Sequence, residues 1–94
     1  MIEYQNKYEE FIIENGVGAN DVVADSVKSY ISYLNSVSNH LEITVSPLTL
    51  SSENDIQNLA AQLEGKVSAK TIKNYRSAMA QYINMISALN LKTN

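Results

Sequence analysis

The sequence Ser-Ala-Lys-Thr-Ile-Lys-Asn-Tyr-Arg-Ser-Ala-Met-Ala-Gln-Tyr-Ile-Asn-Met-Ile-Ser-Ala-Leu-Asn-Leu, from Ser68 to Leu91, is the longest helical pattern in the chain. Its large apolar residues recur at steps of three and four, which puts them on one face of a helix. Ser68 is suited to cap that helix, because its hydroxyl can accept a hydrogen bond from a free amide of the first turn. We expect the apolar face to be buried and the polar face to meet solvent or an anionic partner. The apolar residues are Ile72, Tyr75, Met79, Tyr82, Ile83, Ile86 and Leu89, and the polar ones are Lys70, Lys73, Asn74, Ser77, Gln81 and Asn84.

Charge divides the chain at Gly65. All ten acidic residues precede it, together with only Lys7 and Lys28 of the seven basic residues. This segregation favours a basic surface that faces an anionic partner, but it also fits an acidic domain whose basic helix pairs with its own acids. The net charge of −3 argues against a polycationic nucleic-acid binder, which is usually basic throughout. The basic residues after Gly65 are Lys66, Lys70, Lys73, Arg76 and Lys92.

Length and composition limit the class of protein. A chain of 94 residues predicts one domain with a modest core. The absence of cysteine excludes disulfides and thiolate metal sites. Early acids argue against a signal peptide, and no window approaches about 18 uninterrupted apolar residues. We therefore expect a soluble cytoplasmic protein without a membrane span.

Two further helices are expected in the first half of the chain. The first covers residues 2–15, with Tyr4, Tyr8, Phe11 and Ile12 on its buried side, and ends at Gly16, with Gly18 close behind, because glycine adopts the left-handed turn that ends helices. The second covers residues 21–39 and is capped by Asn20 or Asp21, although a start at Asp25 or Ser26 fits equally well. Its buried stripe is Val23, Val27, Tyr30, Ile31, Leu34 and Val37.

The connection over residues 40–52 precedes another helix. Pro47 forbids helix continuation there and restricts Ser46 to an extended conformation. Ile43, Val45, Leu48 and Leu50 are too apolar for a solvated linker, so we expect this loop to pack across the helices. Ser52 and Asp55 fit a capping box that starts a helix over residues 53–64, and the long helix then covers residues 68–91. The core face of the shorter helix is Ile56, Leu59, Ala60 and Leu63. The pattern predicts an all-α, compact four-helix bundle.

No constellation of catalytic residues is evident. His40 is the only histidine, so no histidine pair can hold a metal, and no nucleophile motif accompanies it. The carboxylate pairs of the first two helices have the spacing of ordinary solvated helix faces. Gly16-Val17-Gly18 lacks the third glycine and the strand of a dinucleotide loop. We expect no catalytic residue, metal or cofactor in this chain.

Three segments follow a pattern that is known from a protein family: Pro47 to Leu59, the run from Val67 to Met79 with Tyr82-Ile83, and the upstream Val27 to Leu34. They resemble the N-terminal core-binding domain of tyrosine recombinases, the phage integrase family. The resemblance covers nearly the whole chain and implies a SAM-like bundle that clamps one side of duplex DNA. In this family a separate C-terminal domain carries the catalytic arginines, histidine and tyrosine. The resemblance therefore implies a domain that binds double-stranded DNA and does not cut it.

The same resemblance implies where DNA is bound. The polar face of the last helix approaches the major groove, where ammonium and guanidinium groups meet phosphates, and amide and hydroxyl groups reach base edges. The implied phosphate contacts are Lys66, Lys70, Lys73 and Arg76, the base-edge residues are Asn74 and Ser77, and the contacts from the second helix are Lys28 and Ser32. The alternative is a non-catalytic adaptor or inhibitor module of phage or mobile-element biology, which uses the acidic first helix or the loop around Pro47 to bind a protein. The sequence leaves the oligomeric state open.

Overall fold

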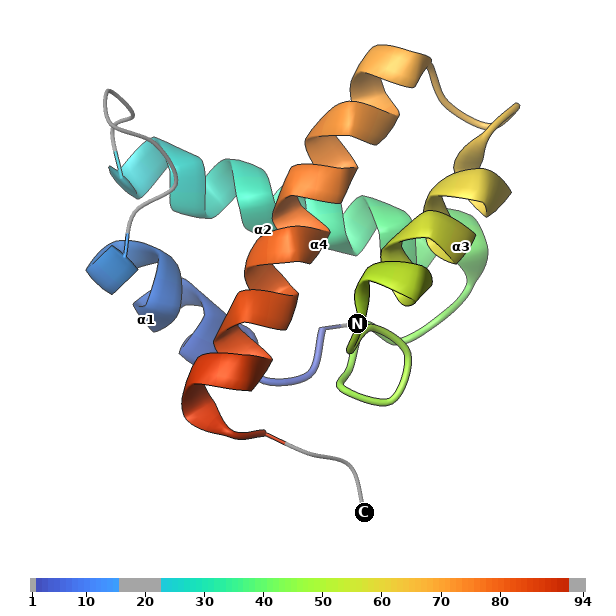
Figure 1. The fold of residues 1–94 in the computed structure, drawn as a ribbon. Coiled ribbons are helices and arrows are strands. Elements are labelled where there is room, and N and C mark those ends of the chain that lie inside the picture. The colour runs from blue at the N-terminus through green and yellow to red at the C-terminus, as the bar shows by residue number, and fades with distance from the viewer. Residues whose placement is uncertain (1, 16–22, 92–94) are drawn as a thin grey trace.

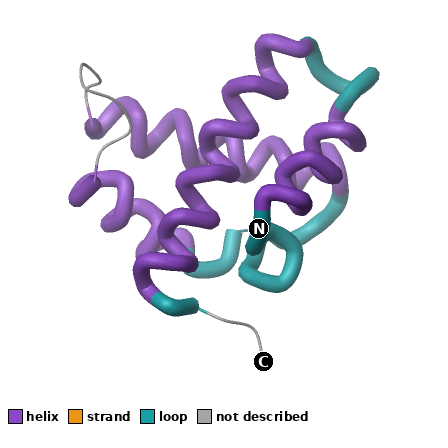
Figure 2. Tube along the Cα trace, in the orientation of Figure 1, coloured by secondary structure: helices purple, strands orange, loops and turns teal. Residues whose placement is uncertain are grey.

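The described part of the chain folds into four helices, and two of these helices cross at the centre of the fold. The computed structural model describes residues 2–15 and 23–91, with side chains from residue 27 onward in the second range. The helices are α1 (Gln5–Asn15), α2 (Val23–Leu41), α3 (Glu53–Leu63) and α4 (Ala69–Leu89). In Figure 1, α4 crosses in front of α2, with α1 on one side of it and α3 on the other. Figure 2 shows a longer loop between α2 and α3 and a short one between α3 and α4, and the described residues form no strand. The prediction of an all-α four-helix fold is confirmed.

The first helix begins three residues later than predicted. Ile2 forms an isolated parallel bridge with Val45, and the Glu3 amide donates a hydrogen bond to the Val45 carbonyl at 2.8 Å. Tyr4 has a φ of 61° and is 39% exposed, so its assignment to the buried stripe of the helix was wrong. The Tyr8 amide donates to the Tyr4 carbonyl at 2.9 Å, and the helix therefore begins at Gln5. The pairing with a distant loop therefore overrides the helical pattern of residues 2–4.

The second helix is continuous from Val23 to Leu41 and ends two residues beyond the predicted boundary. A start at Val23 contradicts the alternative start at Asp25 or Ser26. Glu42 ends the helix in a left-handed conformation, with φ 54°, and the Ile43 amide closes the end by donating to the Ser38 carbonyl at 3.1 Å. The predicted helix stop at Gly16 and Gly18, the caps at Asn20 and Asp21 and the side chains of Val23, Asp25 and Ser26 lie outside the described residues.

The loop between α2 and α3 packs across the bundle with one exception. Val45 and Leu50 are buried, as predicted, whereas Leu48 is 74% exposed. The turn that carries Leu48 is fixed by Ser46, whose Oγ accepts from the Leu48 and Thr49 amides at 3.2 and 3.3 Å. Thr49 Oγ1 also accepts from the Ser46 amide at 3.0 Å. The backbone of the turn thus holds Leu48 outward, against its hydrophobic preference.

The third helix has the predicted core face and a shifted capping box. Ser52 Oγ accepts from the Asp55 amide at 3.4 Å, but the Asp55 carboxylate accepts from the Ser51 amide at 2.9 Å instead of returning to Ser52. Gly65, with φ 86°, turns the chain from α3 towards α4. All the predicted core residues of α3 are buried; they are Ile56, Leu59, Ala60 and Leu63.

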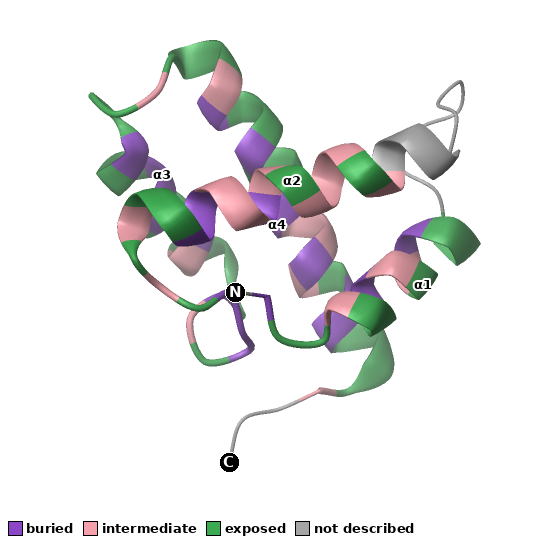
Figure 3. Cartoon of the chain, turned by 180° about the vertical axis from the view of Figure 1, so that it is seen from behind, coloured by how far each residue is buried: buried purple, intermediate pink, exposed green. Residues whose placement is uncertain are grey.

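The buried face of α4 is rotated relative to the prediction. Ala78 and Met85 are fully buried although the apolar periodicity missed them, whereas Leu89 is 46% exposed and Ile83 is only half-buried. The rotation arises because α1 and α2 both pack against α4, and the Tyr8 hydroxyl donates to the Ala78 carbonyl at 2.9 Å. Figure 3 shows the buried residues of the helices gathered where they meet. The buried residues of α4 are Ile72, Tyr75, Ala78, Met79, Tyr82, Met85 and Ile86.

Candidate nucleic-acid interface

The N-terminal end of α4 is built by local hydrogen bonds. Ser68 is the N-cap, as predicted, and its Oγ accepts from the Thr71 amide at 3.2 Å. The two hydroxyl groups also lie 2.9 Å apart, which fixes both side chains at the start of the helix. In Figure 1 the first turns of α4 extend beyond the point where it crosses α2. The fold therefore exposes the part of α4 that carries its basic residues.

The polar face of α4 has two edges that face different neighbours. Lys70, Lys73 and Ser77 follow one another at steps of three and four residues, and all three are exposed. At about 100° per residue, Asn74 and Arg76 lie at the two limits of this face, about 160° apart around the helix axis. The order of residues along α4 thus separates one edge, at Asn74, from the other edge, at Arg76.

The edge at Asn74 borders α2. The ring of Tyr75, the next residue, packs against Tyr33 of α2 with centroids 5.7 Å apart. Lys28 and Ser32 lie four residues apart on α2 and are exposed. They belong to a different helix from the other predicted residues, and Lys66 precedes α4 in the exposed turn after Gly65. All the residues predicted to contact DNA are exposed, and the polar face of α4 brings together five of them: Lys70, Lys73, Asn74, Arg76 and Ser77.

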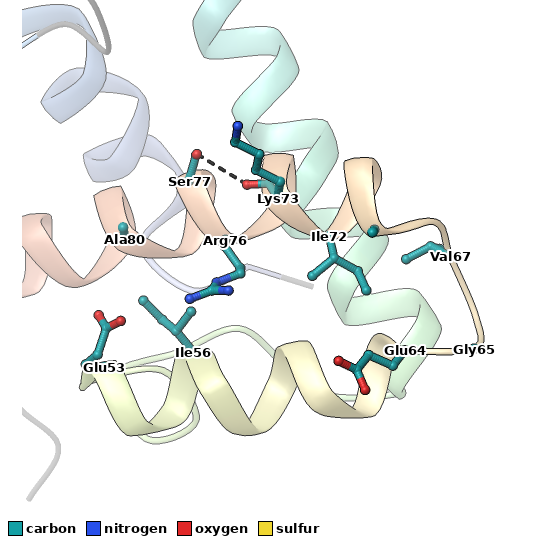
Figure 4. A pocket seen from close by; sticks show the side chains of 11 residues that line it. Glu53, Ile56, Glu64, Gly65, Val67, Ile72, Lys73, Arg76, Ser77 and Ala80 are labelled. Atoms are coloured by element: carbon teal, nitrogen blue, oxygen red, sulfur yellow. Dashed lines mark hydrogen bonds between the residues drawn. The ribbon is translucent and has the colours of Figure 1, made fainter.

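The edge at Arg76 borders α3 across a groove of about 740 Å³. Figure 4 shows the Arg76 side chain reaching towards α3, with Ile56 opposite and the carboxylates of Glu53 and Glu64 on the two sides. Lys73 leaves α4 in the direction away from α3, and the Ser77 hydroxyl donates to the Lys73 carbonyl at 3.3 Å. Sequence reasoning missed the two acids of α3. Their spacing of eleven residues, three helical turns, is the signal that places them on one side of that helix.

The basic residues are not neutralised by contact within the fold. Among residues 2–15 and 27–91, no carboxylate oxygen lies within 4.0 Å of a lysine, arginine or histidine nitrogen. Pairing of Lys70 or Lys73 with Glu9 or Glu10 would have removed this surface, and the described side chains form no such pair. The positive groups of α4 are therefore available to an external anion.

Other kinds of site find no support in the described residues. No cluster of three histidine, cysteine, aspartate or glutamate residues with metal-binding geometry occurs in this part of the chain. None of the described helices combines the length and apolarity that a membrane crossing needs. His40 is exposed in the last turn of α2. Burial raises the pKa of the Tyr8 and Tyr82 phenols above their usual range, which is an effect of core packing.

Together, the fold and this surface define a class: a small all-α domain that presents one long polar helix with unpaired basic residues. The sequence matches the family model described as phage integrase, N-terminal SAM-like domain, over residues 7–88. The chain belongs to this family, which confirms the resemblance found in the sequence. Neither the curated proteins nor the solved structures give a significant match to the chain.

Proposed function

We propose that this domain binds duplex DNA through the polar face of α4, as the DNA-binding part of a tyrosine recombinase whose chemistry is carried out by a separate catalytic domain. The observation that carries the proposal is the line of exposed residues formed by Lys70, Lys73 and Ser77 on one helix, in which the two lysines form no ion pair with the described carboxylates. A helix of this diameter fits the major groove of B-form DNA. Membership of the integrase family supports the same partner.

The residue types of this face divide into two tasks. Lys66, Lys70 and Lys73 carry positive charge along α4 and its leading turn, which suits contact with consecutive phosphates. Asn74 and Ser77 carry amide and hydroxyl groups that can pair with base edges. The exposed residues Lys28 and Ser32 on α2 add a second helix to the same task. The phosphate contacts supply most of the affinity, and the amide and hydroxyl contacts supply sequence preference.

The phosphate contacts predict a strong dependence on salt. Each neutralised phosphate contributes about −0.9 to the slope of log affinity against log salt. Four contacts, made by the three lysines of the α4 segment and Lys28, therefore predict a fall of about three to four decades per decade of salt. A protein that binds another protein through apolar contacts would not show this dependence.

The test is a fluorescence anisotropy titration of the domain with labelled duplexes at two salt concentrations. The double variant Lys70→Glu, Lys73→Glu is expected to lose binding, because it reverses two charges at the centre of the proposed surface. The matched control is Lys7→Glu, which reverses an exposed charge on α1 and is expected to retain binding. A wild-type domain that ignores duplex DNA in dilute buffer would refute the proposal.

A protein-interaction module, such as an adaptor or inhibitor, is the second candidate. Leu48 favours it, because the Ser46 turn holds this leucine 74% exposed next to Pro47. This candidate predicts that Leu48→Ser abolishes binding to a protein partner that co-purifies with the domain, and that duplex DNA is not bound.

A further inference from the structure

We infer that Glu53 and Glu64 are positioning residues for DNA, because their negative charges repel the phosphates that would otherwise reach Arg76. They thereby confine the duplex to the side of α4 that carries Lys70, Lys73 and Asn74. This inference rests on the proposed DNA-binding function and deepens it. It assigns Arg76 a role different from the phosphate contact that the family resemblance implies.

The geometry of α3 puts both acids beside α4. Glu53 and Glu64 line the groove between the two helices from opposite ends, with the buried side chain of Ile56 between them. Both carboxylates are exposed, so neither charge is lost to burial. Glu64 lies at the C-terminal end of α3, where the helix dipole disfavours a negative charge, so its charge does not stabilise the helix that precedes it.

Arg76 lies in the field of both carboxylates without a contact to either. Figure 4 shows its guanidinium group over the groove, between the two acids along α3. No ion pair of 4.0 Å or less joins the described carboxylates to it, so the guanidinium group and the two carboxylates line the same groove without pairing. A phosphate that approached Arg76 would also approach Glu53 and Glu64, and the repulsion would offset the gain.

The other side of α4 carries no such penalty. Lys73 and Ser77 border the same groove, but in Figure 4 their side chains leave α4 in the direction away from α3. On α2, the exposed residues with described side chains include no acid; they are Lys28, Ser32, Asn39 and His40. A duplex that lies towards α2 therefore meets positive and neutral groups, whereas one that lies towards α3 meets two carboxylates. The acids of α3 thus select the orientation of the duplex on a helix face that is wide enough to offer both.

The test counts phosphate contacts from salt dependence in matched variants. In the wild-type domain, Arg76→Gln is expected to leave the slope of log affinity against log salt unchanged, whereas Lys70→Gln reduces it by about 1. In the variant Glu53→Gln, Glu64→Gln, Arg76 becomes free to bind a phosphate. That variant is expected to bind duplex of arbitrary sequence about three- to tenfold more tightly in dilute salt, with a slope steeper by about 1. Adding Arg76→Gln to it is expected to abolish both gains.

The control is Glu10→Gln, Glu14→Gln, which changes the net charge equally through two exposed residues of α1. It is expected to leave the slope unchanged, and circular dichroism checks that every variant has the helix content of the wild type. An equal gain in the α1 control, or a reduced slope for Arg76→Gln in the wild-type domain, would overturn the inference while leaving DNA binding intact. If the wild-type domain binds no duplex at all, the proposed function fails and this inference fails with it.

Discussion

The substitution Tyr82→Phe tests the hydrogen bonds that attach the segment before α1 to α4. The buried Tyr82 hydroxyl donates to the Glu3 carbonyl at 2.7 Å and lies 3.4 Å from the Val45 carbonyl. Its ring packs against Tyr8 with centroids 5.7 Å apart, and phenylalanine keeps that contact. The loss is therefore confined to the hydrogen bonds of the hydroxyl, and only the Glu3 carbonyl loses its partner, because the Val45 carbonyl still accepts from the Glu3 amide.

The expected loss of stability depends on whether water can reach the Glu3 carbonyl. Removing one partner of a buried hydrogen bond costs about 1–3 kcal/mol. Glu3 is exposed, so water can replace part of the bond, and we expect a decrease of about 1–2 kcal/mol in the free energy of unfolding. For a domain of this size each kcal/mol lowers Tm by about 4–8 °C.

Urea unfolding, followed by circular dichroism, measures the change in the free energy of unfolding. Hydrogen exchange of the Glu3 amide reports whether the contact of this segment with Val45 opens more often. The matched control is Tyr33→Phe. The Tyr33 ring packs on Tyr30 and Tyr75, and its hydroxyl makes no hydrogen bond within the described residues. We expect the control to change the free energy of unfolding by less than about 0.5 kcal/mol. An equal effect of the two substitutions would refute the view that the Tyr82 hydroxyl stabilises the fold.

Two further predictions concern stability. Burial raises the pKa of the Tyr8 and Tyr82 phenols, with smaller contributions from Tyr30 and Glu3 respectively, so the native state keeps protons that the unfolded chain loses above about pH 10. The stability from this effect is complete below about pH 10 and falls by about 1.4 kcal/mol per pH unit for each phenol above it, which urea unfolding at several alkaline pH values measures. Replacing both tyrosines with phenylalanine is expected to remove that slope. Gly65→Ala is expected to lower the free energy of unfolding by about 1–2 kcal/mol, because Gly65 has a left-handed φ of 86°. A clash with neighbouring atoms does not contribute, because an added Cβ would meet no heavy atom within 4 Å. Gly65→Asn is expected to cost less, because asparagine adopts this conformation more readily, and a smaller urea midpoint for Asn than for Ala would contradict this explanation.

Sequence patterns correctly predicted the features that depend on residues close together in the chain. Ser68 caps α4 as predicted, because an N-cap depends only on the residues that follow it. The core face of α3 was also predicted correctly, because its buried residues form a single apolar stripe along the helix. The start of α1 was not predictable in this way. Ile2 leaves the helical pattern to pair with Val45, a residue far away in the sequence.

The same distinction applies to the candidate interface: its exposed residues were predictable from the sequence, and its neighbours on α3 were not. The periodicity of α4 was enough to predict that Lys70, Lys73 and Ser77 are exposed, because the burial of one face exposes the other. The sequence could not show that Glu53 and Glu64 lie across a groove from Arg76. That relation depends on the rotation of α3 about its own axis and on its packing against α4. Tertiary packing also explains why Leu89 is exposed and Met85 is buried, against the apolar periodicity.

The negative net charge of the chain is a weak argument against DNA binding once the positions of the charges are considered. In Figure 1, α1 lies beside the second half of α4, whereas the basic residues occupy the first half and the turn before it. At physiological ionic strength the Debye length is about 8 Å, which is short compared with the 35 Å extent of the molecule. A phosphate at Lys70 or Lys73 therefore responds mainly to charges in its own neighbourhood. Under the proposed function, the acids that matter to such a phosphate are Glu53 and Glu64 at the two ends of α3, and these would direct the duplex towards α2 instead of repelling it from the domain.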